Sequence, residues 1–454
     1  MLGDRLRWVR RLAALGGASL CVVGAAVTPA AADGSIRADQ WHLDAMHAPE
    51  MWKISKGRGV TVAVIDGGFK LDHPDLEGQF LPGKDFSESP GGVGSYKEGH
   101  GTQMASLIAR TGKSDGGRGA YGLAPGARVL PVKIANGSEH AVVSADFLDQ
   151  IGQAVTYAVE QGAKVINISQ GTAAVTTSPA DVEKLNRILA WARAKGSLVV
   201  SSVGNSGDKG NLVEYPGALP NVVGVGASDR NATVTAESER GPQVVLVAPG
   251  MDIIGACASP TGYCKSHGTS DATALVSASA ALVWSVHPDW TANQVLRVLI
   301  NTAGKANDGA GRNDIVGYGA VRPRIALTDP GDPGPADVSP LAADVVVPAA
   351  APSPSASAVA AAPVAPAPVV PSPADVPTVQ PQAEVPAPAG GSTLPVVAGV
   401  VAALVLVAGV VFAVMRRGRR PGGQSAVYGP PLPPPPPLPS YQQPVPPEDN
   451  PYAR

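Results

Sequence analysis

Three polar residues, widely separated in the sequence, lie where catalytic side chains could be placed. Asp66 ends the apolar run VTVAVID and is followed by two glycines, which allow a sharp turn. His100 lies in GHGT directly before a helical pattern, and Ser270 lies in GTSDATA at the start of a small, apolar segment. Such residues could serve as the carboxylate, the general base and the nucleophile of an acyl-transfer reaction.

Each of these residues also has an ordinary structural interpretation. Asp66 could be a turn residue, His100 a surface or core histidine, and Ser270 a helix N-cap. For Ser270 taken alone, the N-cap is the favoured interpretation. The combination favours catalysis. Unrelated folds carry the Asp, His and Ser of this triad in three different orders along the chain, and the order here is one of these three.

The segments around Ser270 and Asn205 could stabilise negative charge that develops on a substrate during a reaction. The helix expected after Gly268 is small and apolar on every side, so it should be buried, with Ser270 at the positive end of its dipole. Asn205 lies in VGNSG after an expected strand, and its side-chain amide could donate to an oxyanion. An ordinary asparagine turn is the alternative.

These residues need a fold that brings strand ends together. Short β-branched runs alternate with longer amphipathic segments, which predicts a mainly parallel, doubly wound α/β sheet with helices on both faces. In such sheets, functional groups gather at the carboxyl ends of the strands. The expected strands are residues 60–66, 128–134, 165–169 and 198–203, and the expected helices, each starting at a serine and stopping before a glycine, are 144–161 and 178–195.

The two ends of the chain predict export and attachment to the cell membrane. Residues 1–32 combine arginines, an apolar stretch and an A-x-A site, as a secretory signal peptide does; an uncleaved anchor is the alternative. Residues 394–415 are uncharged and long enough for a transmembrane helix, and the arginines that follow belong on the cytoplasmic side. The globular domain, expected over 33–330, would therefore be extracytoplasmic.

Proline-rich segments lie on both sides of the expected span. The Pro/Ala-rich linker, 331–392, should be an extended, disordered stalk. The tail, 416–454, should be cytoplasmic; its PPLPPPPPLP run could bind an aromatic-lined groove, although a solvated tail is favoured. The net charge of −2 gives no sign of a nucleic-acid partner.

Two cysteines remain once Cys21 is removed with the signal peptide. Cys257 and Cys264 are close in sequence and belong to an exported domain. A disulfide between them is expected from the oxidising compartment, and two free thiols are the alternative.

The sequence resembles the subtilisin-like serine proteases (subtilases) from about residue 55 to 325. The matching motifs are VAVIDGG, HPDL, GHGT, GLAPGARVLPVKI, VINISQG, VGNSG, VAPG and GTSDATA. The resemblance implies a three-layer αβα fold and a serine endopeptidase. Its chemistry would need no metal or cofactor, and the sequence has no H-E-x-x-H cluster and no loop that specifies the structural calcium that subtilases often bind. It implies Asp66, His100 and Ser270 as the catalytic triad and Asn205 in the oxyanion hole. It further implies a substrate cleft walled by Ser169, Gln170, Gly171 and Thr172 and by Ser202, Val203 and Gly204.

Four residues depart from the family pattern. Gly67 replaces a common Ser or Thr after the triad Asp, and Gln103 replaces a second His after GHGT. Ala274 replaces a usual Pro, and Asp271 follows Ser270 where an apolar residue is usual. The Asp271 carboxylate could oppose negative charge in the oxyanion, or it could face away and favour the helix N-terminus.

A narrower resemblance is to the mycosins, the membrane-anchored subtilases of type VII secretion systems. It rests on QWHLDAMHAPEMWKISKGRGVTVAVID, on the Cys257–Cys264 pair, and on the order of signal peptide, protease, Pro-rich linker and single span. It implies protein substrates near the membrane and a type VII secretion membrane complex as a partner. Residues 33–59 are too few for a separate inhibitory prodomain. A mainly structural role in the complex is the alternative, and the anchor argues against a general degradative protease.

Overall fold

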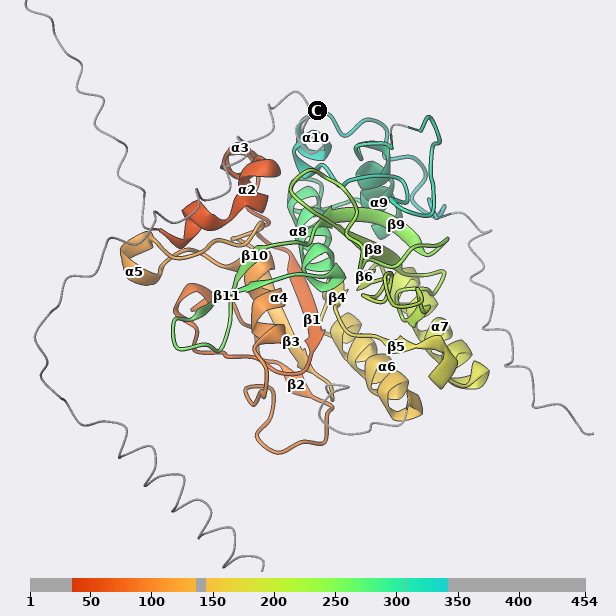
Figure 1. The fold of residues 1–454 in the computed structure, drawn as a ribbon, viewed down its shortest axis with the longest axis horizontal. Helices are drawn as coiled ribbons and strands as arrows, with labels where there is room; N and C mark the ends of the chain where they lie inside the picture. Colours follow the sequence, from red (N-terminus) through yellow and green to blue (C-terminus); the bar gives the residue numbers. More distant parts are fainter. Residues whose placement is uncertain (1–34, 136–143, 307, 342–454) are drawn as a thin grey trace, which may run out of the picture. The chain divides into compact units, whose positions relative to one another are not determined.

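The core of the protein is a parallel sheet, described here from a computed structural model that covers residues 35–135, 144–306 and 308–341. Seven strands follow the order β2-β3-β1-β4-β6-β8-β9, and every neighbouring pair runs parallel. After β1 the chain forms β2 and β3 on one side of it and then β4, β6, β8 and β9 on the other, so the sheet is doubly wound (Figure 1). The strands are β1 (Thr61–Asp66), β2 (Lys84–Asp85), β3 (Arg128–Lys133), β4 (Val165–Ile168), β6 (Leu198–Ser202), β8 (Val223–Ser228) and β9 (Val244–Pro249).

Alternate side chains of the strands enter two separate hydrophobic cores, because successive residues of a strand point to opposite faces. Val62 and Val64 of β1 pack in the core formed with α4, α8, α9 and α10. Ala63 and Ile65 pack in the core formed with α6 and α7. The predicted α/β sheet with helices on both faces is therefore confirmed. The helices are α4 (His100–Ala109), α6 (Ser144–Glu160), α7 (Pro179–Ala194), α8 (Thr269–Val286), α9 (Ala292–Asn301) and α10 (Pro323–Thr328).

The predicted elements match the observed ones to within a residue or two at their ends. Ser178 caps α7 as expected, since its Oγ accepts the backbone N–H of Asp181 at 3.2 Å. Helix α8 is buried along most of its length, as its apolar sequence predicted. Strands β8 and β9 were not predicted. Two further pairs of strands form small antiparallel sheets: β5 (Thr172–Ala173) pairs with β7 (Glu214–Tyr215), and β10 (Ile253–Ala256) forms a hairpin with β11 (Tyr263–Ser266).

The residues before β1 form short helices that pack onto the domain. The indole Nε1 of Trp41 donates to the carbonyl of Met251 at 3.1 Å, and that of Trp52 donates to Leu123 at 2.9 Å. These contacts attach the segment to the domain at residues other than Asp66, His100 and Ser270. The remaining short elements are η1 (Ile36–Asp39), α2 (Trp41–Ala45), α3 (Ala48–Ile54), η2 (Pro74–Leu76), α5 (Ser114–Gly117) and η3 (Ala174–Thr176).

The predicted signal peptide, most of the Pro/Ala-rich linker, the transmembrane span and the tail lie outside the described residues. Within the described ranges, no helix is both long and apolar enough to cross a bilayer.

Candidate active site

Asp66 and His100 meet at the carboxyl end of the central strand. Asp66 is the last residue of β1 and is fully buried, and His100 is the first residue of α4. The imidazole Nδ1 lies 2.9 Å from Oδ2 and 3.0 Å from Oδ1 of Asp66. A Cβ at Gly101 would lie 2.5 Å from the carbonyl oxygen of Gly68, so glycine lets α4 approach β1 this closely.

Two further donors hold the Asp66 carboxylate. The Gly67 backbone N–H donates to Oδ1 at 2.8 Å, and the Gln170 side-chain amide donates to the same oxygen at 3.2 Å. The sequence predicted Gln170 only as part of a substrate wall. Its position just beyond β4, the neighbour of β1, was the one available signal for a contact with Asp66. Gly67 has no hydroxyl that could donate to Asp66, and the Gln170 amide supplies a side-chain donor to this carboxylate instead.

The charges around His100 favour its protonated form. Burial lowers the pKa of the imidazole, but the charge and hydrogen bond of Asp66, with the charges of Asp271 and Glu98, outweigh burial and raise that pKa to about 9. The side chain is 31% exposed, so part of it is accessible to a ligand. His100 therefore acts as a proton acceptor more readily as the pH rises.

Ser270 lies in the first turn of α8, beside the end of β4. Its Oγ donates to the carbonyl of Ser169 at 3.2 Å, and the Ser169 Oγ donates to the carbonyl of Ser270 at 3.1 Å. Within the described residues no hydrogen bond joins Ser270 to His100. The N-terminal backbone N–H groups of α8 point out of the helix beside Ser270, where they can receive negative charge.

Asn205 is held by the residue that precedes Ser270. Its Oδ1 accepts hydrogen bonds from the backbone N–H of Thr269 at 2.9 Å and from the Thr269 hydroxyl at 3.1 Å. The amide Nδ2 of Asn205 has no partner in the described part of the chain, so it is available as a donor. A Cβ at Gly268 would lie 3.1 Å from this nitrogen, and Gly268 has a φ of +126°, so glycine is suited to this approach.

The two unusual residues Gln103 and Asp271 contact each other. The Gln103 amide donates to Oδ1 of Asp271 at 3.2 Å and also contacts the hydroxyl of Ser266, which donates to Oδ2 of Asp271 at 2.6 Å. Asp271 is buried, and burial raises its carboxyl pKa to about 6 against the opposing effects of Ser266, His100, His267 and Gln103. The carboxylate is therefore engaged in a hydrogen-bonded cluster inside the protein.

The two predicted substrate walls lie at the ends of β4 and β6, next to Ser270 and Asn205. Ser169 contacts Ser270 directly, and Gly204 directly precedes Asn205. Val203 is fully buried in a core with Val244 and Val247, so its side chain does not face a cleft. The remaining predicted wall residues occupy the ends of β4 and β6 and the start of β5: Gln170, Gly171, Thr172 and Ser202.

The predicted disulfide joins Cys257 and Cys264, whose Cα atoms are 5.8 Å apart. It closes the hairpin of β10 and β11. A Cβ at Gly99 would lie 3.2 Å from the Cβ of Cys257, so this hairpin packs against the residue that precedes His100.

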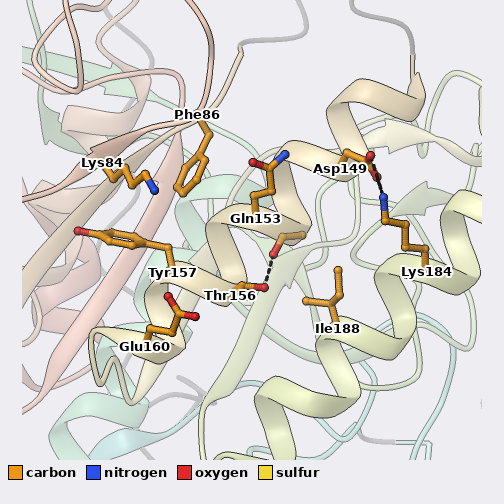
Figure 2. A pocket seen from close by; sticks show the side chains of 10 residues that line it. Lys84, Phe86, Asp149, Gln153, Thr156, Tyr157, Glu160, Lys184 and Ile188 are labelled. Atoms are coloured by element: carbon orange, nitrogen blue, oxygen red, sulfur yellow. Dashed lines mark hydrogen bonds and ion pairs between the residues drawn. The ribbon is translucent and has the colours of Figure 1, made fainter.

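A pocket of about 290 Å³ lies on another part of the domain, between β2, α6 and α7 (Figure 2). Three of its charged groups are already engaged: the Lys84 ammonium lies 4.6 Å from the ring centre of Phe86, and Lys184 lies 2.8 Å from Asp149. No candidate catalytic residue lines this pocket. In the described ranges no three His, Cys, Asp or Glu side chains are grouped as metal ligands.

Comparisons of this chain with a family model and with known proteins agree on one family. Residues 57–319 match the model of the Subtilase family. The chain is 34% identical to an intracellular serine protease of Paenibacillus polymyxa, over 53% of this chain and 71% of that protein. It is 31% identical to thermitase of Thermoactinomyces vulgaris, over 59% of this chain and 88% of that protein.

Two solved structures with similar folds are proteases of type VII secretion systems. The crystal structure of MycP1 from the ESX-1 system has a TM-score of 0.57 and 26% identity, covering 66% of this chain and 89% of MycP1. The structure of the MycP3 protease from the ESX-3 system has a TM-score of 0.56 and 31% identity, covering 66% of this chain and 90% of MycP3.

Proposed function

Because this chain belongs to the subtilase family and is a serine endopeptidase, we propose that Asp66, His100 and Ser270 form its catalytic triad. The observation that carries the proposal is the direct contact, at 2.9 and 3.0 Å, between the buried Asp66 carboxylate and the partly exposed His100 ring. Ser270 lies at the start of a buried helix next to the strand ends that carry this pair, as a nucleophile in such a site would.

In the proposed reaction, the Ser270 hydroxyl turns from Ser169 toward His100 and attacks the carbonyl carbon of a peptide bond. His100 accepts the hydroxyl proton on Nε2 as the new C–O bond forms. Asp66 holds Nδ1–H and stabilises the resulting imidazolium. Hydrogen bonds of this kind are often long in an empty site and shorten when the substrate binds, so the contact with Ser169 is compatible with this role.

The oxyanion of the tetrahedral intermediate needs donors that are already oriented. We assign this role to the Asn205 Nδ2 group and the backbone N–H of Ser270. The two hydrogen bonds from Thr269 to the Asn205 oxygen support the assignment, because they direct the opposite end of the amide away from Thr269.

The intermediate then breaks down to an acyl-enzyme. His100 gives its proton to the leaving amine as the C–N bond breaks, and the first product departs. A water molecule attacks the ester after losing a proton to His100, and the second collapse returns the proton to Ser270. Every proton that moves is carried by His100.

We further propose that the enzyme is anchored in the cell membrane and cleaves proteins beside a type VII secretion complex. The similarity to MycP1 and MycP3 supports the association, and residues 1–32 and 394–415 support the export and the anchor. Removing 394–454 should release the protein from the membrane fraction. Retention of the truncated protein in that fraction would argue against the anchor.

Labelling with a fluorophosphonate tests the proposed nucleophile, because this probe reacts with an activated serine. The purified protein should be labelled, and the Ser270→Ala variant should not, although both should unfold at similar temperatures. Equal labelling of the two proteins would place the reactive serine elsewhere. A folded protein that is never labelled would favour a mainly structural role in the secretion complex.

A further inference from the structure

Two glutamates lie against the glycines of the two proposed substrate walls. A Cβ at Gly171 would lie 2.9 Å from Oε2 of Glu214. A Cβ at Gly204 would lie 2.3 Å from Oε1 and 2.7 Å from Oε2 of Glu239. Each wall therefore has a carboxyl group directly beside it, at a residue that lacks a side chain.

Backbone hydrogen bonds fix both glutamates to these walls. Glu214 belongs to β7, which pairs with β5 in the register Ala173↔Glu214, directly after the wall that contains Gly171. The backbone N–H of Glu239 donates to the carbonyl of Gly204 at 3.2 Å. The positions of the two carboxyl groups thus depend on the same segments that contact Ser270 and carry Asn205.

The carboxyl group of Glu239 has fewer partners than its burial requires. The residue is fully buried, and its Oε1 accepts from the Ser206 hydroxyl at 2.6 Å, while its Oε2 has no hydrogen-bond partner among the residues that the structure describes. Burial first, and then the charge of Glu214, raise the Glu239 pKa to about 7, and burial also raises the Glu214 pKa. Buried carboxylates are normally paired with a cation or fully hydrogen-bonded.

Among the described residues, no positive side chain pairs with either carboxyl group. In the described part of the chain, neither Glu214 nor Glu239 forms an ion pair with Lys, Arg or His. The two carboxyl groups also lack the third ligand that would suggest a metal site among the described residues. The missing partner is therefore expected to come from a molecule that binds between the walls.

We infer that Glu214 and Glu239 select substrates with lysine or arginine immediately before the scissile bond. This inference rests on the proposed function, since it places the reacting carbonyl between Ser270 and Asn205. The residue that carries this carbonyl then directs its side chain between segments 169–171 and 202–204, toward the two glutamates. A lysine or arginine there would bring the cation that both carboxyl groups lack.

Peptide pairs that differ only in this residue test the inference on the full-length protein. Peptides with Lys or Arg should be cleaved at least about 30-fold faster, in kcat/KM, than those with Leu or Gln, as expected for a desolvated charge pair. Glu214→Gln and Glu239→Gln should each reduce the Lys-to-Leu ratio by about tenfold or more. Glu183→Gln removes an exposed glutamate paired with Arg187 and should leave the ratio unchanged.

Equal or faster cleavage of the Leu peptides, or a ratio that neither Gln variant changes, would overturn the inference. Fluorophosphonate labelling separates this result from a failure of the triad. A protein that is labelled at Ser270 but shows no preference for Lys or Arg refutes only the substrate class. A protein without labelling refutes both proposals.

Discussion

Asp66 and Glu239 are both fully buried carboxyl groups beside the proposed cleft, yet their surroundings differ. Asp66 accepts hydrogen bonds from the His100 ring, the Gly67 N–H and the Gln170 amide. Glu239 accepts from Ser206, and within the described ranges its other oxygen has no partner. A carboxylate with a complete set of donors can orient a catalytic group, whereas one that lacks partners is suited to receive a ligand's charge.

Asp271 lies between these two cases. Both of its oxygens have donors, from Gln103 and Ser266, but neither donor is charged. Burial accordingly raises its pKa, to about 6, while the pKa of Glu239 rises to about 7. For Asp271 and Glu239, hydrogen bonds from neutral donors lower the pKa, but burial raises it by more than these bonds lower it.

Replacing Asp66 by Asn should have the largest effect. The amide cannot hold the same His100 tautomer or stabilise the imidazolium, so kcat should fall by about 10⁴-fold, as in other triads. Peptide hydrolysis at a fixed pH measures this loss. Thermal unfolding of the same variant serves as the control, and a loss of less than about tenfold with an intact fold would remove Asp66 from the triad.

The residues that form the proposed triad could be predicted from the sequence because each has a local signal. Asp66 ends an apolar strand, His100 begins a helix, and Ser270 lies in the first turn of a helix without a polar face. The parallel sheet follows from the alternation of strands and helices, and its carboxyl edge then brings the strand ends together. Local pattern and topology were sufficient for these residues.

The glutamates and Gln170 could not be placed in this way. Glu239 meets Gly204 only because the loop between β8 and β9 returns to the end of β6, and neither β8 nor β9 was predicted. Strand β8 contains two glycines, which weaken the pattern of a strand. Glu214 lies in a two-residue strand that has no periodicity of its own. Contacts of this kind depend on tertiary structure rather than on local sequence.

Replacing Glu239 by Gln should change how stability depends on pH. The folded pKa of about 7 lies above the ordinary 4.5, so the wild type holds this proton more tightly when folded and loses stability as the pH rises from about 4.5 to 7. The Gln variant lacks this loss. Between pH 5 and pH 8 its free energy of unfolding should gain about 2 kcal/mol relative to wild type.

Urea unfolding at the two pH values measures this difference, with Ser270→Ala present in both proteins to prevent self-digestion. Glu183→Gln is the matched control, because its carboxylate is exposed and paired. Parallel stability curves for Glu239→Gln and its parent would mean that the Glu239 carboxyl already has a compensating partner, and the contrast with Asp66 would then disappear.

Replacing Asp271 by Asn should have the smallest effect, a shift of the pH–rate profile. The groups that raise the His100 pKa are Asp66, Asp271 and Glu98, so removing one charge while keeping the amide in the Gln103–Ser266 cluster should lower that pKa. The acidic limb of kcat/KM should move to lower pH by less than about one unit.

The exposed Asp252 provides the matched control, since its carboxylate pairs with Lys265 and does not act on His100. Asp252→Asn should leave the acidic limb in place. A shift of the Asp271→Asn limb to higher pH would mean that Asp271 acts on catalysis by shaping the first turn of α8 rather than through its charge. The direction of the shift, more than its size, therefore distinguishes an electrostatic role for this unusual neighbour of Ser270 from a structural one.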